Sequence, residues 1–235
     1  MKKILLKLNV FLWLCLPILG FAQLQVTDLG SAMITPSTLV SGFVGSGIQV
    51  TNVTYIGNNE QVGYFQGVNS TGISNGIILS TGNVNDAPQP NILPSTSTSY
   101  GGAGDVDLDS LVLGQTFDAA SLEIDFVPIG GLVTFNYVFA SEEYPEFANS
   151  NFNDVFAFFL SGPGLPKQNI ALIPGTTLPV SINNVNATVN SNYYVANTDS
   201  TIEYDAYTTM LNATTTLLPN QTYTLKIVIA DVADL

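Results

Sequence analysis

The side chains best suited to chemistry in this chain are carboxylates, and they occur in clusters. Asp105, Asp107 and Asp109 stand at alternate positions, so an extended backbone would point all three to one side. Like charges this close repel unless a cation or water separates them, and an all-oxygen set favours Ca²⁺ over zinc. An EF-hand loop is a poor match, because it wants Gly where Ser110 stands and Glu where Thr116 stands. The alternative interpretation is a solvated acidic loop.

Other acids stand beside strongly apolar segments. Glu142 and Glu143 follow the apolar segment 132–140, Asp154 precedes the segment 155–160, and Asp231 follows the segment 222–230. Acids at the ends of apolar strands suggest a shared, oxygen-lined pocket at one rim of the fold. The predicted Ca²⁺ ligands are Asp105, Asp107, Asp109, Glu142, Glu143, Asp154 and Asp231.

The composition excludes several chemistries. The chain has no His, so no imidazole can activate a nucleophile or bind a metal, and we predict no catalytic residue. Two carboxylates would suffice for a glycoside hydrolase, which stays open as an alternative. Only 5 Lys and Arg residues oppose 18 acids, too few to neutralise a phosphate backbone, so no nucleic-acid partner is expected.

The first 22 residues have the order of a secretory signal peptide. Lys2, Lys3 and Lys7 precede an apolar run that ends on the small residues Gly20 and Ala22. Cleavage after Ala22 would leave two lysines against 18 acids, a formal charge of −16, and no Cys. We therefore expect a secreted protein with no transmembrane segment in its mature chain, held by its core or by bound metal instead of disulfides.

From residue 23 onward the chain reads as one all-β domain. It is rich in Thr, Val and Ile, and several segments alternate apolar and polar residues, as in Leu122-Glu-Ile-Asp-Phe126. Thr35 and Pro36 predict a short helix over 35–40, and a second short turn is expected over 109–113. The expected architecture is an antiparallel β-sandwich of jelly-roll or lectin-like character. The expected strands are 47–55, 76–80, 120–126, 132–140, 155–161, 169–172, 181–185 and 222–230.

Aromatic and amide side chains in expected loops are candidates for ligand binding. Tyr rings commonly stack on sugars or on partner proteins, although they also fill the cores of sandwiches. The candidate ligand-binding residues are Tyr144, Asn153, Tyr193 and Tyr194.

A set of motifs spans nearly the whole mature chain. They are Gly76-Ile-Ile-Leu-Ser-Thr-Gly82, Gly104-Asp-Val-Asp-Leu-Asp109, Asp118 to Pro128, Tyr137-Val-Phe-Ala-Ser-Glu-Glu-Tyr-Pro-Glu-Phe147, Phe152 to Gly164, Asn169-Ile-Ala-Leu-Ile-Pro-Gly175, Val180-Ser-Ile-Asn-Asn-Val185 and Ile229-Ala-Asp-Val232. This set resembles the choice-of-anchor L domain family. The resemblance implies a secreted bacterial surface domain attached through varied C-terminal anchors, with no defined biochemical activity. A shorter stretch, Asn153-Asp154 leading into Ala157 to Leu160, is similar to the Asp-containing strand of legume-type lectins.

The resemblance also bears on the C-terminal end. Members of the family usually continue past the Ile-Ala-Asp-Val motif with an Asp-rich loop, another strand and an anchoring region, whereas this sequence stops at Leu235. The single domain 23–235 is therefore expected to be truncated there. Taken together, the sequence predicts a secreted, cell-surface binding or adhesion module, stabilised by Ca²⁺ and recognising a glycan or a surface protein. A glycoside hydrolase and a purely structural spacer of a larger adhesin are the alternatives.

Overall fold

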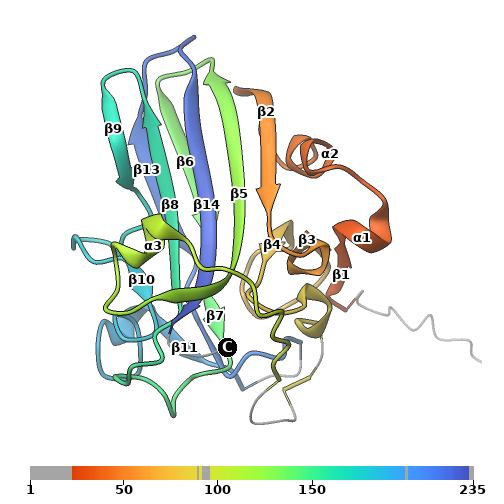
Figure 1. The fold of residues 1–235 in the computed structure, drawn as a ribbon, viewed down its shortest axis with the longest axis vertical. Helices are drawn as coiled ribbons and strands as arrows, with labels where there is room; N and C mark the ends of the chain where they lie inside the picture. Colours follow the sequence, from red (N-terminus) through yellow and green to blue (C-terminus); the bar gives the residue numbers. More distant parts are fainter. Residues whose placement is uncertain (1–22, 89, 92–95, 199–200, 233–235) are drawn as a thin grey trace, which may run out of the picture.

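The computed structural model describes residues 23–88, 90–91, 96–198 and 201–232. The predicted signal peptide, residues 1–22, lies outside this range. Within it, none of the helices has the length and apolar character needed to cross a membrane. The described chain forms an antiparallel β-sandwich, which confirms the predicted fold class (Figure 1).

The larger layer is a six-stranded sheet, here called the main sheet. Its strands alternate apolar and polar residues as predicted: Leu122, Ile124 and Phe126 are buried, while Glu123 is exposed. The order is β10 (Val180–Ser181), β8 (Val155–Gly162), β14 (Tyr223–Val232), β5 (Thr116–Pro128) and β2 (Ile48–Ile56), and β9 (Leu165–Asn169) also pairs with β8.

The second layer consists of smaller pieces. The pair β6 (Leu132–Tyr137) and β13 (Leu211–Thr216) lies behind β8 and β14 in Figure 1, and its inward side chains share one core with the main sheet. The other pieces are β1 (Gln25–Asp28), β3 (Val62–Gln66) and β4 (Asn75–Leu79) in one sheet, and β11 (Tyr194–Ala196), β12 (Ala206–Thr208) and β7 (Ala140–Ser141) in another.

Short helices lie between the strands. Helix α2 (Pro36–Ser41) has Thr35 as its N-cap and Pro36 at its first position, as predicted. The short turn expected at 109–113 is present at 110–111, where it continues a helix that the sequence did not predict: α3 spans Val106–Asp109, with Asp105 as its N-cap. The remaining helices are α1 (Leu29–Ala32) and the 3₁₀ turns η1 (Asn59–Gln61), η2 (Val84–Asp86) and η3 (Ser191–Tyr193).

Helix α3 covers the outer face of the main sheet. Leu108 packs there against Val155, Ala157, Val228 and Ala230, all of them fully buried. The opposite side chains of β8 and β14 enter the core between the layers. Strand β8 is therefore buried on both faces, as its uninterrupted apolar sequence predicted.

Candidate cation site at the rim of the sandwich

The carboxylates that the sequence places at 105–109 hold α3 against the main sheet. Asp105 Oδ1 accepts hydrogen bonds from the backbone N–H groups of Asp107 (3.0 Å) and Leu108 (3.3 Å). These bonds form a helical cap, so the three acids do not alternate along an extended backbone as predicted. Asp109 Oδ1 accepts from the backbone N–H (2.8 Å) and the hydroxyl (2.7 Å) of Thr116.

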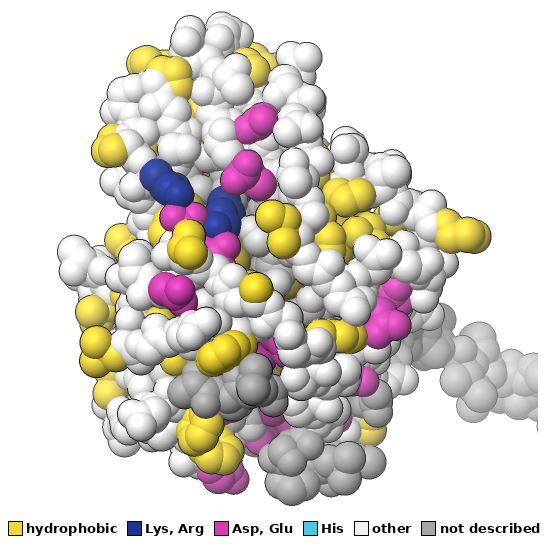
Figure 2. Space-filling view, viewed as in Figure 1, with side chains coloured by type: hydrophobic (Ala, Val, Ile, Leu, Met, Phe, Trp, Pro, Cys, Tyr) yellow, Lys and Arg dark blue, Asp and Glu magenta, His cyan; other side chains and the backbone are white. Residues whose placement is uncertain are grey.

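Both lysines of the described chain pair with this segment. Lys226 Nζ lies 2.5 Å from Asp105 Oδ2 and 2.8 Å from Asp107 Oδ2, and Lys167 Nζ lies 2.6 Å from Asp107 Oδ1. Figure 2 shows the two dark-blue lysine side chains among acidic ones on this face. Burial alone would raise the pKa of Asp107, but the bonds to the two lysines outweigh it and hold that pKa below its ordinary value.

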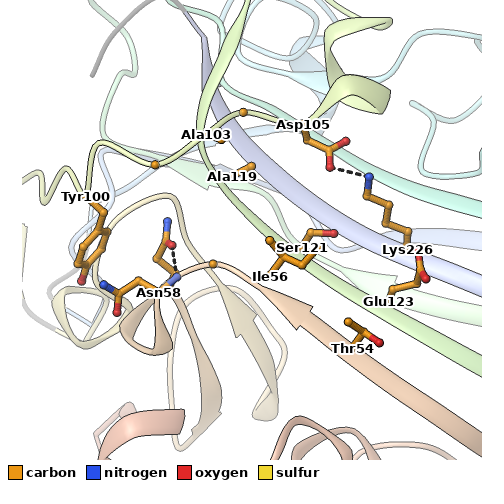
Figure 3. A pocket seen from close by; sticks show the side chains of 14 residues that line it. Thr54, Ile56, Asn58, Tyr100, Ala103, Asp105, Ala119, Ser121, Glu123 and Lys226 are labelled. Carbon is orange, nitrogen blue, oxygen red and sulfur yellow. Dashed lines mark hydrogen bonds and ion pairs between the residues drawn. The ribbon is translucent and has the colours of Figure 1, made fainter.

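A hollow of about 410 Å³ opens beside the Asp105–Lys226 ion pair. In Figure 3 the hollow runs from Tyr100 and Asn58 to this ion pair, with Thr54 and Glu123 along its lower side. Because the lysine charge already neutralises Asp105 and Asp107, this part of the molecule does not need a cation to offset its acids.

A second group of acids lines one pocket of about 230 Å³ at the rim of the sandwich. We call it the rim pocket. Strands β4, β7 and β14 end beside it and β8 begins there. The structure thus brings four of the seven predicted metal ligands to one place and leaves Asp105, Asp107 and Asp109 elsewhere. The acidic residues of its lining are Asp86, Glu142, Glu143, Asp154, Glu203 and Asp231.

Local structure explains how these acids reach the same pocket. At the end of β7, the Ser141 hydroxyl accepts from the Glu143 backbone N–H (3.1 Å) and donates to Asp154 Oδ2 (3.4 Å), so it joins the end of β7 to the start of β8. Asp231 stands at an irregularity where the pairing of β14 with β5 shifts. Asp86 and Glu203 were missed because neither belongs to an acidic cluster beside an apolar strand.

Two of these acids are poorly compensated. Both carboxylate oxygens of Glu142 are buried and lack a hydrogen-bond partner of normal geometry. Burial, followed by the charges of Asp205 and Glu203, raises the pKa of Glu142 to about 8, against a weaker opposing effect of the Thr96 backbone N–H. Glu203 is only 3% exposed; its Oε1 accepts from the Thr96 hydroxyl, and its buried Oε2 has no partner.

The side chains that line the pocket could bind a metal ion through oxygen atoms only. The hydroxyls of Ser80, Thr81, Thr96 and Thr98 join the carboxylates in its lining. Within the described ranges, however, no three carboxylates stand so that they could hold a metal ion by themselves. An ion here would need hydroxyl, carbonyl or water oxygens as well, which suits Ca²⁺ with its six to eight oxygen ligands and flexible geometry.

The candidate ligand-binding residues lie outside the lining of this pocket. Tyr144 is fully buried; its hydroxyl donates to the Val185 carbonyl (2.6 Å), so its ring does not face solvent. Tyr194 contacts that ring edge-on at 5.3 Å and, like Tyr193, is half-buried against the core. Asn153 Oδ1 accepts from the Asn183 backbone N–H at 2.9 Å.

Comparison with known proteins gives one informative result. No curated protein and no solved structure is significantly similar to this chain. The sequence model of the choice-of-anchor L domain, by contrast, matches residues 26–235, which is nearly all of the described chain and includes both acidic groups. This match confirms the resemblance seen in the motifs, and the chain belongs to the choice-of-anchor L domain family.

Proposed function

We propose that this protein is a surface binding module whose rim pocket holds one Ca²⁺. The family to which it belongs is a surface-associated domain. The observation that carries the proposal is the state of Glu142 and Glu203. Three of their four carboxylate oxygens are buried in one pocket without a hydrogen-bond partner of normal geometry.

The physical reason is the cost of burying charge. A carboxylate removed from water is strongly disfavoured unless a cation or hydrogen bonds compensate it. The two described lysines are engaged at Asp105 and Asp107, and the rim pocket has none in its lining. The pocket can therefore relieve its charge either by keeping a proton on Glu142 or by binding a cation, and a divalent ion relieves more of it.

The bound ion would fix the loop between β7 and β8 for a partner. Phe147 in this loop also lines the rim pocket; it is 45% exposed and packs edge-on against Phe152 with ring centroids 5.3 Å apart. An exposed aromatic face beside hydroxyl groups suits a sugar ring or a protein surface. We propose a glycan or a surface protein as the partner, with the domain secreted and held at the cell surface through a C-terminal anchor.

Thermal melting with and without Ca²⁺ tests the metal proposal. After treatment with a chelator, millimolar Ca²⁺ should raise the Tm of the mature chain, because a ligand at 100 times its Kd stabilises by about 2.7 kcal/mol. Glu142→Gln should lose most of this rise. Glu123→Gln, an exposed residue on β5 outside the rim pocket, is the matched control and should keep it. An unchanged Tm in the wild type would overturn the proposal.

A glycoside hydrolase is the second candidate, and the raised pKa of Glu142 favours it. A carboxyl group with a pKa of about 8 keeps its proton at neutral pH, as a general acid must, and other acids share its pocket. Incubation with a polysaccharide panel separates the two candidates. Release of reducing ends that disappears in Glu142→Gln would favour the enzyme, retention without turnover would favour the binding module, and a structural spacer would show neither.

A further inference from the structure

An apolar groove of about 550 Å³ runs along the second layer between β4 and β6. All five residues of β4, Asn75–Leu79, line it, and so do the four consecutive β6 residues at 134–137. Successive side chains of a strand point to opposite faces, so a cavity over one face would touch only every second residue. The groove therefore borders the edges of both strands.

These two edges have no strand partner in the part of the chain that the structure describes. Strand β4 pairs with β3 alone, and β6 pairs with β13 alone. Each strand thus presents a row of backbone N–H and C=O groups to the groove. An occupant that satisfies both rows must itself carry backbone donors and acceptors along two sides.

The floor of the groove is a part of the hydrophobic core that is only partly covered. Strand β14 is central in the main sheet, between β5 and β8. Its outward residues Val228 and Ala230 are 0% exposed, yet its inward residues Ile227 and Ile229, which line the groove, are only half-buried. The inward face of a central strand is normally the best-covered part of a sandwich, but no strand among the described residues covers this part of β14.

Tyr137 belongs to the floor of the groove. Tyr137 lines the groove and is 6% exposed, and its hydroxyl is buried without a hydrogen-bond partner. Its ring packs against Phe156 and Phe158 of the floor, at centroid distances of 5.2 and 5.1 Å.

We propose that the groove accepts one β-strand of another polypeptide chain, which pairs with β4 on one side and with β6 on the other. Both strands run toward the rim pocket, since the residues that follow each of them line it. A strand antiparallel to both would run away from the rim. The groove lining contains no Asp, Glu, Lys or Arg, so the strand is uncharged and its alternate side chains, which face the floor, are apolar.

Two other occupants fit less well. An acyl chain would cover the floor but would leave both rows of backbone groups unsatisfied. An edge strand of a second folded copy is already paired on one side, so it cannot pair with β4 and β6 at once. This inference concerns a different site from the rim pocket and stands whether or not Ca²⁺ binds there.

A nine-residue peptide of alternating threonine and valine, with blocked ends, is a direct probe. Hydrogen exchange of the mature chain should slow in both β4 and β6 when the peptide is added. A peptide of the same composition with its valines in one block should give no protection, because it cannot present alternate side chains to the floor. Protection of only one edge, or of neither, or equal binding of the block peptide would overturn the proposal.

Variants supply a second readout by fluorescence anisotropy of the labelled peptide. Ile227→Trp fills the floor and should weaken peptide binding at least tenfold. Thr216→Trp, exposed at the end of β13 and paired with Leu132 outside the groove lining, should leave it unchanged. Exchange protection in the wild type keeps the test decisive if Ile227→Trp does not fold. Concentration-dependent dimers in sedimentation without peptide binding would contradict the proposal and favour a second copy.

Discussion

Binding of Ca²⁺ at the rim pocket should release a proton, in an amount set by pH. The pKa of Glu142 is raised to about 8, so at pH 7 about 0.9 of these side chains carry a proton. A metal ligand must be deprotonated, so each Ca²⁺ bound at pH 7 should displace about 0.9 proton, and at pH 9 only about 0.1. Apparent affinity should accordingly fall about tenfold for each pH unit below 8.

The same residue makes a contribution to the stability of the metal-free protein that depends on pH. The ordinary pKa of this side chain is 4.5, and in the folded protein it is raised to about 8. Between pH 4.5 and pH 8, Glu142 therefore holds a proton in the native state that it has lost in the unfolded chain. The contribution of Glu142 to stability therefore falls as pH rises from 4.5 to 8 and is level above 8. A shift of one pKa unit corresponds to ~1.4 kcal/mol. After a discount for the partial exposure of Glu142, the free energy of unfolding should fall by about 2–3 kcal/mol over this pH range.

Titration calorimetry in two buffers of different ionisation enthalpy measures the released protons. The wild type and Glu123→Gln should show the pH-dependent release described above. Glu142→Gln should show little release at either pH, and its metal-free stability should change less between pH 5 and 9. Ca²⁺ binding with no proton release at pH 7 would refute the assignment of Glu142, as would equal release at pH 7 and pH 9.

Three further substitutions test the supports of the fold by urea denaturation. Lys226→Met removes the charge that Asp105 and Asp107 share and should cost about 2 kcal/mol; an unchanged midpoint would show that the ion pairs do not hold α3. Tyr144→Phe leaves the buried Val185 carbonyl without its donor and should cost ~1–2 kcal/mol of stability. Any glycan binding should be unchanged in this variant, whereas a ligand-binding role for the Tyr144 side chain predicts that it weakens. Thr35→Ala removes the cap of α2 and should cost about 1 kcal/mol, whereas Thr35→Ser should cost much less.

The strands that the sequence predicts best are those whose side chains alternate or are continuously apolar. Strands β2, β5, β8 and β14 fall within a few residues of their expected ranges. Strand β13, with the polar sequence Leu-Asn-Ala-Thr-Thr-Thr, was missed. It forms a strand by pairing with β6, which lies about 80 residues earlier in the sequence. The strand expected at 181–185 is only two residues long, because Asn186 Oδ1 accepts from the backbone N–H groups of Thr188 and Val189 and forms a turn.

The candidate site was predictable where acids adjoin strand ends. Glu142 and Asp154 lie at the end of β7 and the start of β8, so the rim where these strands meet brings them into one lining. The role of Asp105 and Asp107 was not predictable, because Lys226 is more than 100 residues away in the sequence. Glu203 is an isolated acid whose burial depends on the packing of distant segments, and sequence clustering does not reveal it.

The most direct test of the cation proposal is a crystal structure of the mature protein with Ca²⁺, solved with long-wavelength anomalous data. The account predicts one anomalous peak in the rim pocket, with an oxygen of Glu142 about 2.3–2.6 Å from the ion and the loop between β7 and β8 drawn toward it. No peak in the rim pocket at saturating Ca²⁺, or a peak only among Asp105, Asp107 and Asp109, would contradict it.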